Sequence, residues 1–166
     1  AFNMRKPPFD DIRVRKAFAY LYNREKMMDK LFFNEYEFLD SFYPNSPYEN
    51  PDNPKMRYNP DKAVELLEEA GWLQKNRDSQ GWLVKDGKRF EVSLNLTQKS
   101  SERIYTILQE DLKDVGIKLN LKLVTWATDI KEVGERNFEI SSRAYSGIMF
   151  PNPESSMHSK FADRNN

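Results

Sequence analysis

The stretch FEVSLNLTQKSSERIYTILQEDLKDVGIKLNLKLV, residues 90–124, decides the fold class of this chain. Residues 90–96 alternate apolar with polar side chains, which predicts a half-buried strand. Apolar residues then recur with the helical period over 104–115, and Gly116 supplies a helix stop. Residues 117–123 alternate again. A strand, a helix and a second strand in this order predict two parallel strands joined by a right-handed crossover.

The next segment along the chain extends this unit. A shorter helix is expected over about 127–135, and a third strand over 138–144. The fold class is therefore α/β, with a mainly parallel β-α-β-α-β sheet flanked by helices. Asp86-Gly87 between two strand-like runs predicts an additional β-hairpin just before residue 90.

Two helices are expected in the first part of the chain. One is predicted over about 11–32 with Asp10 as its N-cap, and the other begins after the cap Asn59 and stops at Gly71. Ser100 or Ser101 is expected to cap the helix that follows the first strand of the sheet. Five of the nine prolines fall within residues 40–60, which predicts a long Pro-rich loop.

The composition excludes several classes of protein. A chain of 166 residues with 31% charged and 39% hydrophobic side chains suits one soluble globular domain. Its 26 basic and 26 acidic residues cancel, which argues against a nucleic-acid partner. The chain has no cysteine, and no apolar run is long enough to cross a bilayer. It begins with Ala, which is expected of a segment cut from a longer protein.

Ligands of open α/β sheets sit beyond the carboxyl ends of the strands. Three predicted segments meet at that edge, 97–99, 125–126 and 143–147, and two helix N-termini open there. They carry aromatic rings, an arginine, hydroxyls and an amide, which suit a binding surface rather than a reaction centre. The candidate residues at this edge are Gln98, Trp126, Arg143, Tyr145, Ser146 and Gly147. An alternative interpretation, in which Trp126 and Tyr145 only close the ends of the core, stays open.

The sequence offers little for catalysis or for a cofactor. His158 is the only histidine, and no Ser or Cys nucleophile motif accompanies it. There is no Gly-rich phosphate loop and no His or Cys cluster for a transition metal. The neighbouring carboxylates, such as Glu110-Asp111, fall on predicted helix surfaces. We therefore expect no catalytic residue, no metal site and no cofactor.

Three stretches carry a resemblance to a known family. The first is FDDIRVRKAFAY with Asn-Arg-Glu, residues 9–20 and 23–25. The second runs from YNPDKA to LLEEAGW over 58–72, and the third is the 102–138 unit with its LQEDL, VGI and RNF motifs. Together they resemble family 5 of the extracellular solute-binding proteins, the peptide, dipeptide and nickel receptors of ABC importers. The opening NMRKPPF and the ending FPNPESS look most like the branch that takes up oligopeptides and microcin-type peptides.

The resemblance implies a fold and an organisation. It implies one lobe of a type II periplasmic-binding-protein fold, with residues 1–166 forming a single α/β lobe. Segments 1–9 and 145–166 would be the crossover or hinge segments that join it to the rest of a two-lobed protein. It also implies that Tyr145, Ser146 and Gly147 line the ligand cleft, with Tyr replacing the family's usual Trp. Asn152 and Glu154 stand near the family's acidic stretch that holds the ligand's amino group. Asn replaces the expected Asp there, which leaves Glu154 as the substitute candidate.

The function implied by the resemblance is reversible capture of oligopeptides. The partners would be a peptide ligand and, through the full-length protein, an ABC permease in the inner membrane. The protein would be a monomer in the periplasm or outside the cell, and not an enzyme. Other classes stay open: a stand-alone protein-interaction module, a small hydrolase that uses His158, or a family member that binds nickel, haem or sugar instead of peptide.

Overall fold

The computed structural model describes residues 1–143 together with Glu154 and His158. The chain divides into two compact units, one of Ala1–Phe38 with Lys55–Arg143 and one of Leu39–Pro54 with Ala144–Asn166. The helices and strands named below all belong to the first unit.

The centre of the first unit is a three-stranded sheet in the order β4-β3-β5. β3 (Glu91–Leu96) pairs in parallel with β4 (Lys118–Leu123) on one side and with β5 (Ile140–Ser141) on the other. The N-terminal segment borders β5, because Phe2 pairs with Ile140 in an antiparallel bridge. The predicted α/β class and the parallel sheet are confirmed, while β5 is shorter than the strand expected over 138–144.

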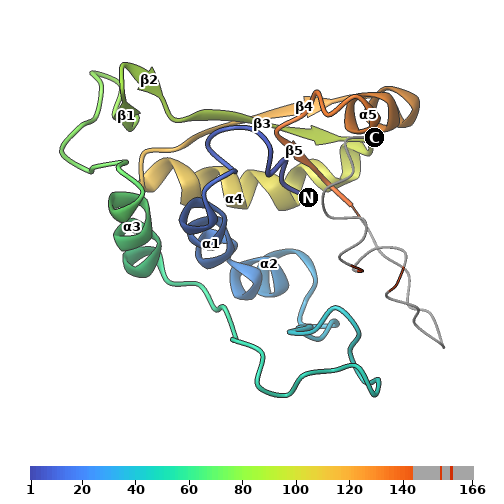
Figure 1. Cartoon of the computed structure of the whole chain (residues 1–166). Helices are drawn as coiled ribbons and strands as arrows, with labels where there is room; N and C mark the ends of the chain where they lie inside the picture. Colours follow the sequence, from blue (N-terminus) through green and yellow to red (C-terminus); the bar gives the residue numbers. More distant parts are fainter. Residues whose placement is uncertain (144–153, 155–157, 159–166) are drawn as a thin grey trace. The chain divides into compact units, whose positions relative to one another are not determined.

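Four helices lie together on one side of this sheet (Figure 1). They are α1 (Ile12–Leu21), α2 (Arg24–Leu31), α3 (Pro60–Glu69) and α4 (Glu102–Asp114). The core forms where α1 and α4 meet the apolar side chains of β3, with Phe18, Leu94 and Leu112 all at most 3% exposed. Burial of this apolar surface is the main force that holds the unit together. α5 (Trp126–Gly134) follows β4 at its carboxyl end.

The helix predicted over 11–32 is wrong in one respect, because the structure divides it into α1 and α2. Asn23 leaves the helical region and its side chain accepts a hydrogen bond from the amide of Lys26 at 3.0 Å, so that it caps α2. The predicted cap Asp10 is also displaced by one residue. Asp11 is the N-cap of α1, and its Oδ1 accepts from the amide of Arg13 at 2.8 Å.

The serine cap predicted before α4 is wrong too. A short 3₁₀ helix, η1 (Lys99–Ser101), leads into α4, and Ser101 already has helical angles with φ −78° and ψ −14°. Its side chain makes no capping hydrogen bond. A capping side chain needs an extended backbone to reach the amides of the first turn, and a 3₁₀ turn removes that geometry.

Most other signals for chain reversal are confirmed. Asn59 caps α3 through a 2.9 Å hydrogen bond from the amide of Lys62, and Gly71 ends that helix with a φ of +89°. Asp86 and Gly87 both have positive φ between β1 (Val84–Lys85) and β2 (Lys88–Arg89). Such angles are what a two-residue hairpin turn requires.

Residues 39–54 of the second unit contain no regular helix or strand, as expected for the Pro-rich loop. Side chains bond to the local backbone instead: Ser46 Oγ donates to the Tyr43 carbonyl at 2.8 Å. The ring of Tyr43 lies 5.0 Å from that of Phe42 and 6.2 Å from that of Tyr48, measured between centroids. Local turns and a small aromatic cluster therefore order this loop.

Candidate functional site

The carboxyl ends of the three strands lie level with one another. Leu96 is paired with Leu123, and Asn95 with Ser141, so the chain leaves β3, β4 and β5 along one edge. We call this edge the carboxyl rim. The residues that follow it include three of the candidates, Gln98, Trp126 and Arg143, which all lie in the first unit.

Trp126 is the first residue of α5 and is 60% exposed. The helix begins there because the Thr125 side chain accepts a hydrogen bond from the amide of Thr128 at 3.1 Å. An exposed tryptophan does not fit the alternative in which this ring only closes the core. Leu123 and Ile130 are also exposed, at 61% and 47%, so the rim carries apolar side chains in contact with water.

Arg143 lies against Trp126. Its guanidinium carbon is 5.4 Å from the centroid of the Trp126 ring, which is a cation–π distance. Its Nη2 forms an ion pair of 2.9 Å with Asp129 Oδ2, and only 18% of the Arg143 side chain is exposed. The structure thus brings together two candidates that lie 17 positions apart in the sequence.

Asp129 is the residue of this rim that sequence reasoning missed. It is fully buried under α5 and accepts hydrogen bonds from Ser141 Oγ at 3.1 and 3.3 Å in addition to the Arg143 ion pair. A buried carboxylate needs such partners. The only available signal was an acid in a short helix opposite an arginine that follows a strand, which is too common a pattern to single out.

Gln98 is exposed at the same rim, where it precedes η1 and its carbonyl accepts from the amide of Ser101 at 3.1 Å. The contacts that join Trp126 to Arg143 do not include it. Glu154 is exposed as well, and its carbonyl accepts from the amide of His158 at 3.2 Å. Tyr145, Ser146, Gly147 and Asn152 lie outside the described residues, so their roles and that of Glu154 stay predictions.

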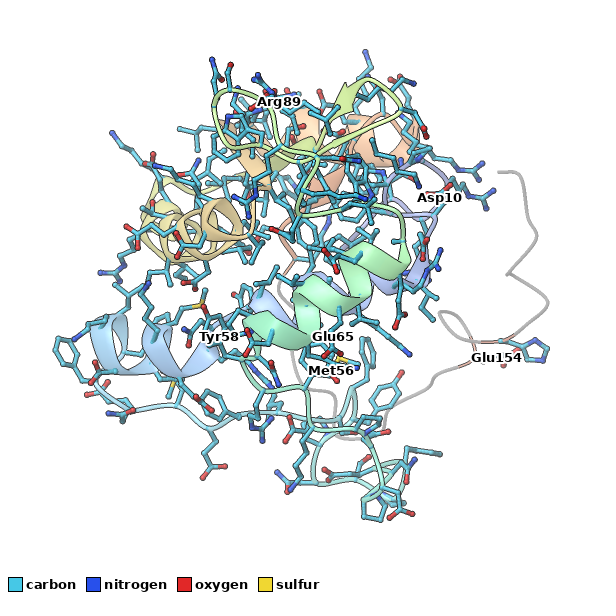
Figure 2. All side chains as sticks on the ribbon, turned by 90° about the vertical axis from the view of Figure 1, so that its left-hand side faces the viewer. Asp10, Met56, Tyr58, Glu65, Arg89 and Glu154 are labelled. Atoms are coloured by element: carbon cyan, nitrogen blue, oxygen red, sulfur yellow. The ribbon has the colours of Figure 1, made fainter. Side chains whose placement is uncertain are left out.

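A pocket of about 380 Å³ opens next to Arg143, between α1, α4 and β5. Buried apolar side chains form its floor: Phe18, Leu94, Leu108 and Ile140. Half-buried side chains form its mouth: Ala19, Tyr22, Arg24, Met56, Tyr105, Ser142 and Arg143. We call this cavity the α1–α4 pocket. Figure 2 shows Met56 on the chain segment that leads into α3.

The mouth of the α1–α4 pocket is polar but not acidic. Tyr105 Oη and Ser142 Oγ are 2.6 Å apart, and Arg24 Nη2 donates to the Met56 carbonyl at 3.0 Å. Burial, helped by the neighbouring Tyr105, raises the pKa of Tyr22 to about 12, so this phenol stays neutral. No aspartate or glutamate is among the residues that line the pocket.

A second hollow, of about 1100 Å³, lies at the opposite end of the sheet, beside Glu91 and the β1–β2 hairpin. Several of the charged side chains that line it form ion pairs, either with each other or with residues outside the lining. Arg89 contacts Asp78 at 2.6 Å, Arg13 contacts Asp11 at 2.6 Å, and Lys118 contacts Glu91 at 3.0 Å. This hollow is larger, but open α/β sheets bind ligands at the other end of their strands. Asp10 and Arg89, labelled in Figure 2, belong to its lining.

Within residues 1–143 and the two described positions beyond them, no three His, Cys, Asp or Glu side chains are grouped so as to hold a metal ion. No helix in the described part of the chain combines the length and apolar character needed to cross a bilayer.

Comparison with known proteins identifies the family. The model of the bacterial extracellular solute-binding proteins, family 5 Middle, matches residues 1–166. The oligopeptide-binding protein AppA of Bacillus subtilis (strain 168) is 31% identical over 167 residues, which cover 95% of this chain and 30% of AppA. The nickel-binding periplasmic protein of Escherichia coli (strain K12) is 30% identical over 151 residues, covering 89% of this chain and 26% of that protein. The chain thus spans less than a third of the length of either relative.

Solved structures agree with this assignment. AppA of Bacillus subtilis in complex with a nonapeptide superposes with a TM-score of 0.80 at 30% identity, covering 96% of this chain and 32% of AppA. NikA of Brucella suis in complex with Fe(III)-EDTA gives a TM-score of 0.80 at 24% identity, covering 90% of this chain and 30% of NikA, and this likeness concerns the fold. The expected resemblance is confirmed, and these relatives are named as binding proteins. The chain belongs to the bacterial extracellular solute-binding proteins of family 5, and its fold is an α/β lobe of the type II periplasmic-binding-protein kind.

Proposed function

We propose that this chain is one lobe of a two-lobed receptor that captures oligopeptides for an ABC importer. The receptor would act as a monomer in the periplasm or outside the cell and would deliver the peptide to a permease in the membrane. It would perform no catalysis. Segments 1–9 and 145–166 would connect the lobe to the rest of the protein.

One observation supports a peptide as the ligand. Trp126 stands exposed on the carboxyl rim with Arg143 against its ring, and Arg143 also borders the α1–α4 pocket. An aromatic face, a fixed guanidinium and hydroxyl groups next to an apolar pocket suit a ligand with both polar main-chain groups and apolar side chains. The likeness to AppA, whose structure holds a nonapeptide, supports the same choice.

The proposed mechanism is closure of two lobes over the ligand. The free protein samples open and closed arrangements, and the peptide stabilises the closed one because it contacts both lobes only there. Each lobe alone offers half of the contacts. We therefore expect that residues 1–166 alone bind peptides far more weakly than the full-length gene product. A submicromolar complex between a peptide and residues 1–166 alone would contradict the two-lobe mechanism.

The first experiment identifies the natural ligand. The full-length gene product is purified natively from its host and denatured, and the released small molecules are analysed by mass spectrometry. A ladder of peptide masses is expected. Release of nickel, haem or a sugar would overturn the choice of peptide and leave the family assignment intact. A protein that carries no small molecule and instead copurifies with a partner protein would favour an interaction module.

The second experiment tests whether the carboxyl rim contributes to peptide binding. Trp126→Ala in the full-length protein should weaken peptide binding by at least about tenfold, since an aromatic contact that is buried on binding contributes about 1.5–3 kcal/mol. Trp82→Ala is the matched control, because Trp82 precedes the β1–β2 hairpin at the opposite end of the sheet. Calorimetry measures the affinity of both variants. An equal loss of affinity in both would argue against a role of the carboxyl rim in peptide binding.

A further inference from the structure

The α1–α4 pocket has the size of a subsite for one side chain. Its volume is about 380 Å³. A buried apolar cavity of about 150 Å³ is already large enough to accept benzene. One aromatic or branched side chain therefore fits, with some water at the mouth, whereas a whole oligopeptide does not.

The chemistry of the pocket selects the kind of side chain. Its floor consists of core residues, with Phe18, Leu94 and Leu108 at most 4% exposed, so a group that enters it leaves water. Two arginines, Arg24 and Arg143, border the mouth, and no carboxylate lines the pocket. A lysine or arginine side chain placed there would lose its hydration and would find no carboxylate in the lining to pair with.

The mouth also offers partners to the main chain that would carry the side chain. The hydroxyls of Tyr105 and Ser142, 2.6 Å apart, both lie among the lining residues, and each can donate or accept a hydrogen bond. Tyr22 keeps its proton because burial raises its pKa to about 12. These neutral groups can bind amide groups next to an apolar side chain.

We propose that the α1–α4 pocket is a specificity subsite that takes one large uncharged apolar side chain of the peptide, such as Leu or Phe, and rejects Lys and Arg. This inference rests on the proposed peptide-binding function. It adds a preference for large apolar side chains, and this preference follows from the acid-free lining and the buried floor of the pocket.

The test uses the full-length gene product and synthetic pentapeptides built on an alanine backbone. Each of the five positions in turn carries Gly, Leu, Phe, Trp, Lys or Glu, and competition calorimetry gives the relative affinities. At one position Leu and Phe are expected to bind at least about tenfold better than Lys, the effect of burying one large apolar side chain.

Two variants change the volume of the pocket in opposite directions. Ala19→Phe fills it from α1, so the preference for Leu and Phe at that position should disappear while Gly peptides keep their affinity. Met56→Ala enlarges it and should improve binding of the Trp peptide. Ala19→Ser is the matched control that keeps the volume, and thermal unfolding of each ligand-free variant confirms that it folds.

The outcomes separate this inference from the function on which it rests. Pentapeptides that bind with the same side-chain preference in wild type and Ala19→Phe would overturn the subsite and leave peptide capture standing. The same holds if Ala19→Phe lowers only the stability of the ligand-free protein, because another part of the protein would then occupy the pocket. A wild-type protein that binds none of the pentapeptides and releases no peptide on denaturation would overturn both.

Discussion

The two faces of β3 are built differently. On one face Val92, Leu94 and Leu96 pack into the core that α1 and α4 complete. On the other face Ser93 and Asn95 are also buried, at 8% and 4% exposure, yet they are polar. Asn95 Nδ2 donates to Glu132 of α5 at 2.6 Å, and Ser93 Oγ donates to Glu139 at 2.6 Å.

The difference between the two faces explains how α5 is oriented. Its residue Asp129 is fully buried, whereas Trp126 and Ile130 are 60% and 47% exposed. The helix therefore turns carboxylates toward the sheet and apolar side chains toward water, the reverse of an ordinary surface helix. Hydrogen bonds hold it in place, and its apolar side chains Trp126 and Ile130 stay exposed to water. The apolar face of the sheet supplies stability, and the polar face positions the carboxyl rim.

The largest effect is expected on the apolar face. Leu112→Ala removes a side chain of α4 that is 0% exposed. It should lower the free energy of unfolding by about 2–5 kcal/mol, because burial is lost and a cavity remains. Urea unfolding followed by circular dichroism measures this change. A loss below about 1 kcal/mol would show that the core between α4 and the sheet is looser than its burial implies.

A smaller effect is expected on the polar face. Asp129→Asn removes the partner of Arg143 and weakens the hydrogen bonds from Ser141, so unfolding should become easier by about 1.5–3 kcal/mol. Glu135→Gln is the matched control on α5, since its pair with Lys131 is exposed and 3.9 Å long. Hydrogen exchange should show faster opening of α5 than of α4 in the Asp129→Asn variant. Uniform loss of protection would mean that the two faces unfold as one.

The smallest effect is expected at a buried carboxyl group of α4. Asp111 of α4 is 4% exposed, and its Oδ2 has no hydrogen-bond partner among the described residues. Burial raises its pKa above the ordinary 3.8, although Lys26 Nζ lies 3.3 Å from Oδ1 and acts in the opposite direction. The folded state thus holds this proton more tightly than the unfolded chain does. The stability from this carboxyl is present at low pH and is lost as pH rises through the folded pKa.

The substitution Asp111→Asn removes the titrating carboxyl group, and with it the loss of stability at rising pH. The free energy of unfolding of the variant, relative to wild type, should therefore rise between about pH 3 and about pH 7, by up to about 1 kcal/mol. Urea unfolding at several pH values measures it, with Asp114→Asn on the same helix as the control. A difference that falls with increasing pH would mean that the Lys26 ion pair outweighs the cost of burying Asp111.

The α/β class, the parallel sheet and most chain reversals could be predicted from the sequence, because these features depend on local signals. Alternation over 90–96, the cap Asn59 and the Asp86-Gly87 turn act within a few residues, and the structure has each of them. The local signals failed where two local interactions competed. Asn23 ended a helix that periodicity alone would continue, and η1 replaced a serine cap.

The composition of the carboxyl rim, in contrast, depends on contacts between segments that lie far apart in the sequence. Strand pairing between Asn95 and Ser141 brings the end of β5 beside α5, and this places Arg143 against Trp126 and Asp129. The α1–α4 pocket likewise combines residues from Ala19 to Arg143 that share no local pattern. Contacts between distant segments create the buried carboxylate, the stacked guanidinium and the pocket without acids. Local sequence patterns do not show which distant segments will meet, so these features could not be predicted from them.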